Sequence, residues 1–181
     1  YFTRYVQHIA DAMGKDFQYV ITINEPTIYA TMSYHQEKWP PEESSELMTL
    51  WVLLNIAKAH KKSYKILKKS NKDLKVGLAH NCAHFYAGDD SKLSQLSAWV
   101  SHKVGNELFI NRVKRHQDFF GLNYYFAKEF HGTKVHNPNK RLNDLGWDMQ
   151  PDKVEPLMEK LYAKYKLPIL ISENGLPDMH D

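Results

Sequence analysis

YVITINEP at residues 19–26 and PILISENG at residues 168–175 are the two stretches that decide how this chain folds. Each is an apolar run, rich in isoleucine, that leads to a glutamate: Glu25 in the first and Glu173 in the second. Such a run predicts a buried parallel strand that delivers a charged side chain to the carboxyl edge of a sheet. In (β/α)₈ barrels that edge carries the catalytic groups, so the two glutamates are the first candidates for catalysis.

Strands and helices alternate along the rest of the chain. A helix over residues 2–13 ends at a glycine, and an amphipathic helix rich in lysine follows the first strand. The pattern predicts four strands, at residues 17–23, 75–81, 119–123 and 167–172, and further helices around residues 93–113 and 153–165. Four βα units in sequence imply a parallel sheet with right-handed crossovers, and we expect an α/β fold in a single domain over residues 1–181.

Four motifs, in order, resemble glycoside hydrolase family 1, the β-glucosidase family. NEP at residues 24–26 resembles the acid/base motif and ISENG at residues 171–175 the nucleophile motif. Between them, DFFGLNYY at residues 118–125 resembles the sixth-strand motif and GWDMQP at residues 146–151 the loop before strand seven. The resemblance implies a (β/α)₈ barrel of the TIM type, of which this chain would hold about four consecutive βα units, strands four to seven.

Counterparts of the first three strands and of the eighth are not recognisable in the sequence. Those strands carry several of the sugar-binding residues in the family that the chain resembles. The chain also begins at Tyr1 rather than at a methionine. We therefore expect a central to C-terminal part of such a barrel, with the rest of the barrel supplied by the remainder of the polypeptide or by a second copy of the chain.

The resemblance also assigns catalytic roles. It implies a retaining β-glycosidase that works by a two-glutamate double displacement, with Glu25 as acid/base and Glu173 as nucleophile. Tyr125 would orient Glu173 through a hydrogen bond. The family mechanism uses no cofactor and no metal, so we expect neither here.

Four further residues are expected to contact the sugar. Asn24 would offer its amide to the 2-hydroxyl, and Asn123 would lie in the same pocket. Trp147 would form an apolar platform on the aglycone side, although plain packing of its loop is an equal alternative. Asn81, at the end of its strand, either lines the pocket or only ends the strand.

Two histidines and the cysteine invite a metal interpretation. His80, Cys82 and His84 alternate, as ligands on one face of a strand would, but no distant fourth ligand is evident, so we do not expect a zinc site. His131 and His136 are expected to be loop histidines. The lysine-rich helix could bind an anionic polymer, but a solvated outer face of the barrel is the simpler explanation.

Composition sets limits on partners and location. The net charge of +3 is too small to argue for nucleic acid, and no apolar run approaches the ~20 residues of a membrane span. Cys82 is the single cysteine, so an internal disulfide is excluded and a reducing, cytoplasmic location is expected. The expected partner is a β-glucoside or a related small saccharide, with no nucleic acid and no membrane.

Two functions from different classes remain open at this point. The first is the retaining β-glycosidase, which would need the missing strands for activity. The second is a non-catalytic half-barrel that binds sugar weakly or assembles with another chain. Another glycosidase family of the same clan would share the two glutamates, but the NYY and ENG sequences at residues 123–125 and 173–175 disfavour it.

Overall fold

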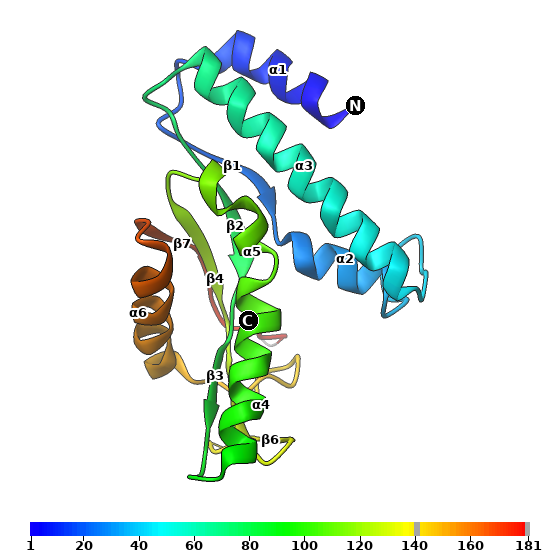
Figure 1. Cartoon of the computed structure of the whole chain (residues 1–181), viewed down its shortest axis with the longest axis vertical. Coiled ribbons are helices and arrows are strands. Elements are labelled where there is room, and N and C mark those ends of the chain that lie inside the picture. The colour runs from blue at the N-terminus through cyan, green and yellow to red at the C-terminus, as the bar shows by residue number, and fades with distance from the viewer. Residues whose placement is uncertain (140–141, 180–181) are drawn as a thin grey trace. The chain divides into compact units, whose positions relative to one another are not determined.

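The computed structural model describes residues 1–139 and 142–179 as two compact units (Figure 1). The first unit comprises Tyr1–Asn81 and Phe109–Gly121, and the second comprises Cys82–Leu108 and Leu122–Asp181. Strand β4 (Phe120–Tyr124) begins in the first unit and ends in the second.

The first unit contains two parallel strands covered by helices. β1 (Tyr19–Asn24) pairs with β2 (Lys75–Asn81), with Tyr19 opposite Lys75 and Ile21 opposite Gly77, and the start of β4 lies against β2. Two helices, α1 (Phe2–Met13) and α3 (Glu46–Ser70), pack on each other. Their apolar faces form a small core with the strands, which includes Val6, Ala10, Leu67, Leu74 and Val76.

Local sequence explains where these helices begin and end. Ser45 caps α3, because its hydroxyl accepts a hydrogen bond from the Met48 amide at 3.3 Å. Gly14 follows the last residue of α1, and Pro26 begins α2 (Pro26–Tyr34). The unit also contains the short helix α5 (Ile110–Val113) and a 3₁₀ turn at Lys114–His116.

Asp118 anchors the start of β4 within the first unit. Its carboxylate accepts hydrogen bonds from the Val76 amide at 3.0 Å, from the Tyr64 hydroxyl at 3.0 Å and from Lys68 at 3.1 Å. Burial alone would raise the pKa of Asp118, but these three hydrogen bonds outweigh that effect, and the pKa is lowered. Lys68 therefore turns inward from the lysine-rich face of α3, on which Lys58, Lys62 and Lys69 are exposed.

The second unit combines one strand pair with a separate sheet. Hydrogen bonds join the end of β4 to β7 (Ile169–Asn174), and α6 (Val154–Tyr165) precedes β7. A three-stranded sheet has the order β3-β5-β6, with bounds His84–Ala87, Ala127–His131 and Lys134–His136. β3 and β5 are parallel, and β5 and β6 form an antiparallel hairpin.

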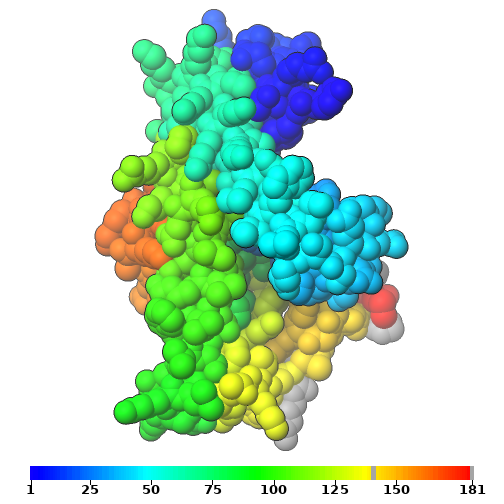
Figure 2. Space-filling model, turned by 45° about the vertical axis from the view of Figure 1, so that its right-hand side comes forward, coloured from blue at the N-terminus to red at the C-terminus, as the bar shows by residue number. Residues whose placement is uncertain are grey.

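Helix α4 (Lys92–His102) packs along the sheet of β3 and β5. Figure 2 shows the surface of the hairpin region, in yellow, beside that of α4, in green. After α4 the chain forms a π turn at Lys103–Glu107. Glu107 within this turn is 4% exposed and pairs with Lys103 at 2.8 Å and with Lys164 of α6.

The predicted pattern of strands and helices is confirmed for the main elements, with shifts of one or two residues at strand ends. Strand 75–81 and helix 2–13 have the predicted bounds. The interpretation of His131 and His136 as loop histidines was wrong, because they lie on β5 and β6. Among the described residues, no helix is long and apolar enough to span a bilayer.

Candidate functional site

Glu25 lies at the junction of β1 and α2 in an unusual backbone conformation. Its φ of 45° and ψ of 56° are left-handed, which is uncommon for a residue with a side chain. The Glu25 amide donates to the Ala79 carbonyl at 2.9 Å, and Pro26 fixes the next φ at the start of α2. Strain of this kind, about 1 to 3 kcal/mol, persists where the surroundings enforce it and is frequent at functional sites.

The side chain of Glu25 meets Asn81 within the first unit. Because β1 and β2 are parallel, their carboxyl ends lie at one edge, and Asn81 Nδ2 donates to Glu25 Oε1 at 3.0 Å. Glu25 is half-buried and Asn24 beside it is exposed. A cavity of about 250 Å³ opens next to them, with Tyr29 and Trp39 on its wall. The carboxylate thus has a fixed donor on one side and open space on another.

Glu173 lies near the carboxyl end of β7 in the second unit. Tyr125, directly after β4, donates its hydroxyl proton to Glu173 Oε2 at 2.7 Å. The neighbours of Glu173 hold the two strand ends together: Ser172 Oγ donates to Asn123 Oδ1 at 2.7 Å, and Asn174 Nδ2 donates to the Tyr124 carbonyl at 2.7 Å. One hydrogen bond therefore holds the half-buried Glu173 carboxylate, and two more tie the residues on either side of it to β4.

Trp147 lies beside the same tyrosine. Its ring centroid is 5.7 Å from that of Tyr125 and 5.1 Å from that of Phe126, and the side chain is half-buried. The Trp147 amide donates to Asn143 Oδ1 at 3.0 Å, which fixes its loop. The indole is packed on aromatic rings and also lies close to the residue that contacts Glu173, so its role as a sugar platform stays a prediction.

The structure brings the seven predicted residues together in two groups. Glu25, Asn24 and Asn81 form the group in the first unit. Glu173, Tyr125, Trp147 and Asn123 form the group in the second, where Asn123 is fully buried. Sequence reasoning did not single out Ser172 and Asn174, although polar residues on both sides of a glutamate near a strand end are a signal that could have found them.

The alternating residues His80, Cys82 and His84 do not share one strand, since β2 ends at Asn81 and β3 begins at His84. The alternation that raised the metal hypothesis therefore does not place them on one face. His84 is buried, and burial, with the charges of Lys160 and Lys153, lowers its pKa to about 4.

Comparison with known proteins agrees with the motifs. The sequence model described as Glycosyl hydrolase family 1 matches residues 1–115. A 1,4-beta-D-glucan glucohydrolase of Thermotoga neapolitana is 22% identical over 97% of this chain and 50% of its own length.

Two solved structures show the same fold. A hyperthermophilic β-glucosidase mutant, described as forming a dodecamer in the crystal, superposes with a TM-score of 0.89 at 22% identity over 99% of this chain and 44% of its own. A β-glucosidase of Thermotoga maritima in complex with glucoimidazole superposes with a TM-score of 0.83 at 21% identity over 98% of this chain and 48% of its own. The chain thus spans about half the length of the curated relatives that it matches, and its fold is part of a (β/α)₈ barrel.

Proposed function

The chain belongs to glycosyl hydrolase family 1, and from that premise we propose that it carries the two catalytic carboxylates of a retaining β-glycosidase. Glu173 is the nucleophile and Glu25 is the acid/base. The substrate class is a terminal β-linked glucoside or a closely related glycoside, since the relatives are named as a glucan glucohydrolase and as β-glucosidases. No metal or cofactor takes part in this proposed reaction.

In the first step, Glu173 attacks the anomeric carbon while Glu25 gives its proton to the departing glycosidic oxygen. The C–O bond to the aglycone breaks, and a glycosyl ester on Glu173 forms. In the second step, Glu25 as carboxylate takes a proton from water, the water oxygen attacks the anomeric carbon, and Glu173 leaves. Two inversions restore the original configuration.

The neighbouring side chains fit these roles. Tyr125 donates to one oxygen of Glu173 at 2.7 Å, which holds the carboxylate in place and leaves its other oxygen for attack. Asn81 donates to Glu25 Oε1 at 3.0 Å and fixes the orientation of the acid. The Tyr125 to Glu173 hydrogen bond is the observation that carries the proposal, because a plain surface glutamate would not need a dedicated phenolic donor.

A mechanism-based trap tests the proposal on the protein as it occurs naturally. A 2-deoxy-2-fluoro glucoside with a good leaving group should inactivate the enzyme and add one sugar mass to the peptide that contains Glu173. The same reagent should leave Glu173→Gln unmodified. Sugar on any other residue, or none in an active preparation, would remove the assignment of Glu173.

A non-catalytic role is the second candidate, and the exposed apolar side chains of β7, Leu170 and Ile171, favour it because another chain could cover them. In that case the chain would bind sugar weakly or assemble with another chain. A natural protein that neither turns over aryl β-glycosides nor reacts with the fluoro sugar, yet still binds a glucose-like inhibitor, would support this second function.

A further inference from the structure

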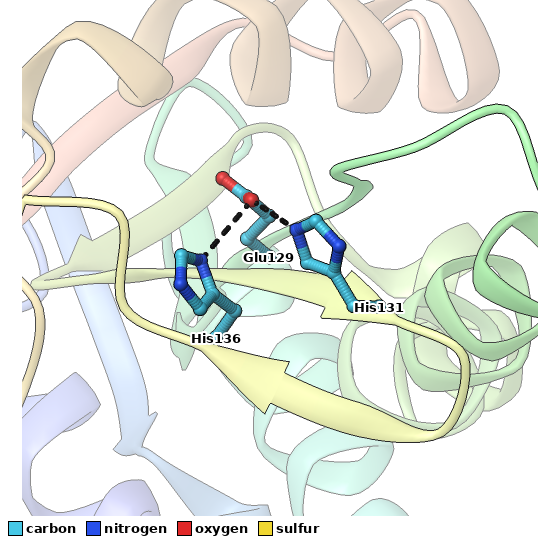
Figure 3. Close-up of side chains that lie close together, drawn as sticks. All are labelled: Glu129, His131 and His136. Carbon is cyan, nitrogen blue, oxygen red and sulfur yellow. Dashed lines mark hydrogen bonds and ion pairs between the residues drawn. The ribbon is translucent and has the colours of Figure 1, made fainter.

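The hairpin of β5 and β6 presents three metal-binding side chains on one face. Glu129 and His136 are directly opposite each other in the antiparallel register, and His131 follows Glu129 by two positions on the same strand. Residues two apart on a strand, and residues paired across it, share a face of the sheet. Figure 3 shows the three side chains converging from the two strands.

Their donor atoms are already close to the spacing of a coordination shell. Glu129 Oε1 lies 2.7 Å from His131 Nε2 and 3.4 Å from His136 Nδ1, and the three donor atoms all lie within 4.8 Å of one another. A tetrahedral ion with bonds of about 2.0 to 2.2 Å separates its ligands by roughly 3.3 to 3.6 Å. The 3.4 Å separation falls within that range, and the 2.7 Å separation is shorter.

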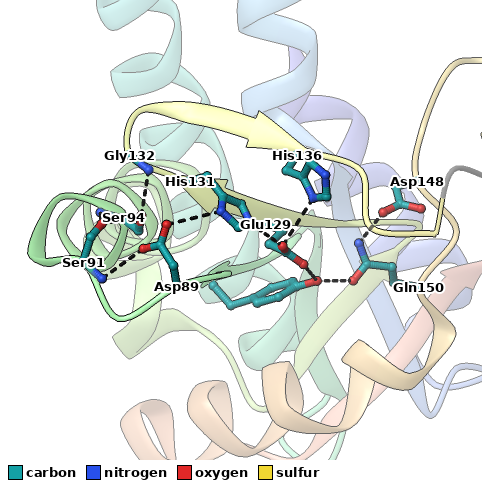
Figure 4. A network of polar contacts seen from close by, with 10 residues as sticks. Asp89, Ser91, Ser94, Glu129, His131, Gly132, His136, Asp148 and Gln150 are labelled. Carbon is teal, nitrogen blue, oxygen red and sulfur yellow. Dashed lines mark hydrogen bonds and ion pairs between the residues drawn. The ribbon is translucent and has the colours of Figure 1, made fainter.

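Neighbouring groups orient two of the three side chains. Asp89 Oδ2 lies 3.2 Å from His131 Nδ1, so the ring nitrogen that faces the cluster is Nε2. A carboxylate on the far nitrogen is the usual support of a metal-binding histidine. Tyr86 lies 2.8 Å from Glu129 Oε2, which leaves Oε1 facing both imidazoles. Figure 4 shows these contacts as one connected network.

The charges in the network suit a cation. Asp89 Oδ1 accepts a hydrogen bond from the Ser91 amide at 2.9 Å, which fixes the carboxylate beside His131. The Glu129 side chain is only 12% exposed, whereas those of His131 and His136 are 43% and 54% exposed. The cluster therefore combines a largely shielded anion with two imidazoles that reach solvent.

Gly88, directly after β3, lies against the cluster. A Cβ at this position would collide with both Glu129 Oε1 and His131 Nε2. Glycine at position 88 therefore lets the backbone approach two of the three donor atoms closely.

We propose that Glu129, His131 and His136 bind one divalent transition-metal ion, with Zn²⁺ as the preferred ion and water completing the shell. Two imidazoles and one carboxylate suit Zn²⁺, whereas Mg²⁺ and Ca²⁺ favour oxygen ligands alone. The ion would hold β6 against β5. It would also stabilise the loop that carries Trp147, because Tyr86, which contacts Glu129, lies 2.8 Å from Gln150 in that loop. The site does not depend on the proposed hydrolase activity.

Zn²⁺ titration of untagged, chelator-treated protein tests the site. Calorimetry should show one ion bound per chain, and Zn²⁺ should raise the melting temperature. His136→Ala, at a half-exposed edge-strand position, removes one ligand and should weaken binding at least tenfold. His8→Ala, at another exposed histidine, should bind as the wild type does.

Two results would overturn the proposal. One is a wild-type protein that binds no Zn²⁺, which would leave Glu129, His131 and His136 as an ion-pair cluster only. The other is undiminished binding in the His131→Ala/His136→Ala double variant, which would place the ion elsewhere. Circular dichroism of each variant, compared with the wild type, shows whether a loss of binding reflects a loss of fold.

Discussion

At the scale of single residues, two glutamates with similar sequence contexts have different surroundings. Glu25 sits on a left-handed backbone with an amide donor from Asn81, whereas Glu173 has a phenol donor from Tyr125. Each donor holds its carboxylate in a defined position. The motifs, rather than these contacts, distinguish the acid from the nucleophile in the proposed mechanism.

Glu25→Ala in the natural protein tests the acid role directly. General acid catalysis contributes about 10²-fold to 10⁴-fold, so turnover of glycosides with poor leaving groups should fall by that factor. Activated aryl glycosides need no protonation and should lose much less in the bond-breaking step. Added azide should partly restore their turnover and give a β-glycosyl azide. An equal loss of turnover on all substrates, without rescue by azide, would contradict the acid role. Glu159→Ala, at an exposed glutamate of α6, is the matched control and should keep the wild-type turnover.

His60 of α3 makes the stability of the first unit depend on pH. Its Nε2–H donates a hydrogen bond to the His116 carbonyl at 2.8 Å. In the neutral ring Nδ1 therefore accepts a hydrogen bond from the Thr22 hydroxyl, and Nδ1 and Oγ1 are 2.7 Å apart. Burial lowers the pKa of His60 to about 4 from an ordinary value of 6.5, although the His116 carbonyl opposes the shift. Between these values the unfolded chain binds more protons than the folded one, so stability falls as the pH falls.

His60→Gln should remove this pH dependence while it keeps a donor and an acceptor. The shift predicts that wild type loses about 2 kcal/mol at this residue between pH 7.5 and pH 5, and the variant none of it. Urea unfolding at the two pH values measures the difference. Other buried histidines, such as His84, are present in both proteins, so their contributions to the pH dependence cancel when the two are compared. An identical pH response in wild type and variant would show that His60 is not kept neutral.

At the scale of elements, the sequence predicted the strands that end in site residues, because each is a nearly continuous apolar run of the kind that parallel strands require. It did not predict β5 and β6, since AKEFH and KVH contain few apolar residues. Gly132 and Thr133 form a two-residue link between the strands, and Gly132 has a φ of 61°. A glycine in such a short link is a hairpin signal from which the two strands could have been predicted. The cluster of Glu129, His131 and His136 depends on that hairpin register, so it was missed as well.

The link between the π turn and α6 is a second element-level feature. Glu107, buried in the turn, accepts from Lys103 and Lys164, whose side chains are 40% and 31% exposed. Glu107→Ala should destabilise the second unit by about 2 kcal/mol, less than the 3 to 5 for breaking a fully buried pair, because both lysines reach water. Chemical unfolding measures the loss, with Glu159→Ala as the near-neutral control. A loss below about 0.5 kcal/mol would show that the ion pairs are dispensable.

At the scale of the whole molecule, the chain holds about half of a barrel by the coverage of its relatives. Both outer strands are apolar yet open to solvent: in the first unit Ile21 of β1 is 38% exposed, and in the second unit Leu170 and Ile171 of β7 are 40% and 47% exposed. Within the described residues, β1 pairs only with β2. A closed barrel gives every strand two neighbours, so these strands have the character of surfaces that further strands would cover.

A polypeptide of residues 1–181 alone should therefore turn over an aryl β-glucoside at less than about 1% of the rate of a full-length family member assayed beside it. Both carboxylates are present, but positioning of the sugar can account for about 7 to 11 kcal/mol of a barrier, and half a barrel supplies only part of the positioning groups. The Glu173→Gln variant sets the background of the assay, so that traces of a contaminating glycosidase are not mistaken for activity. Light scattering on the same sample reports whether copies associate, since a second copy could cover the exposed strands and restore turnover. A monomer with the full family rate would show that residues 1–181 contain all the groups needed for catalysis.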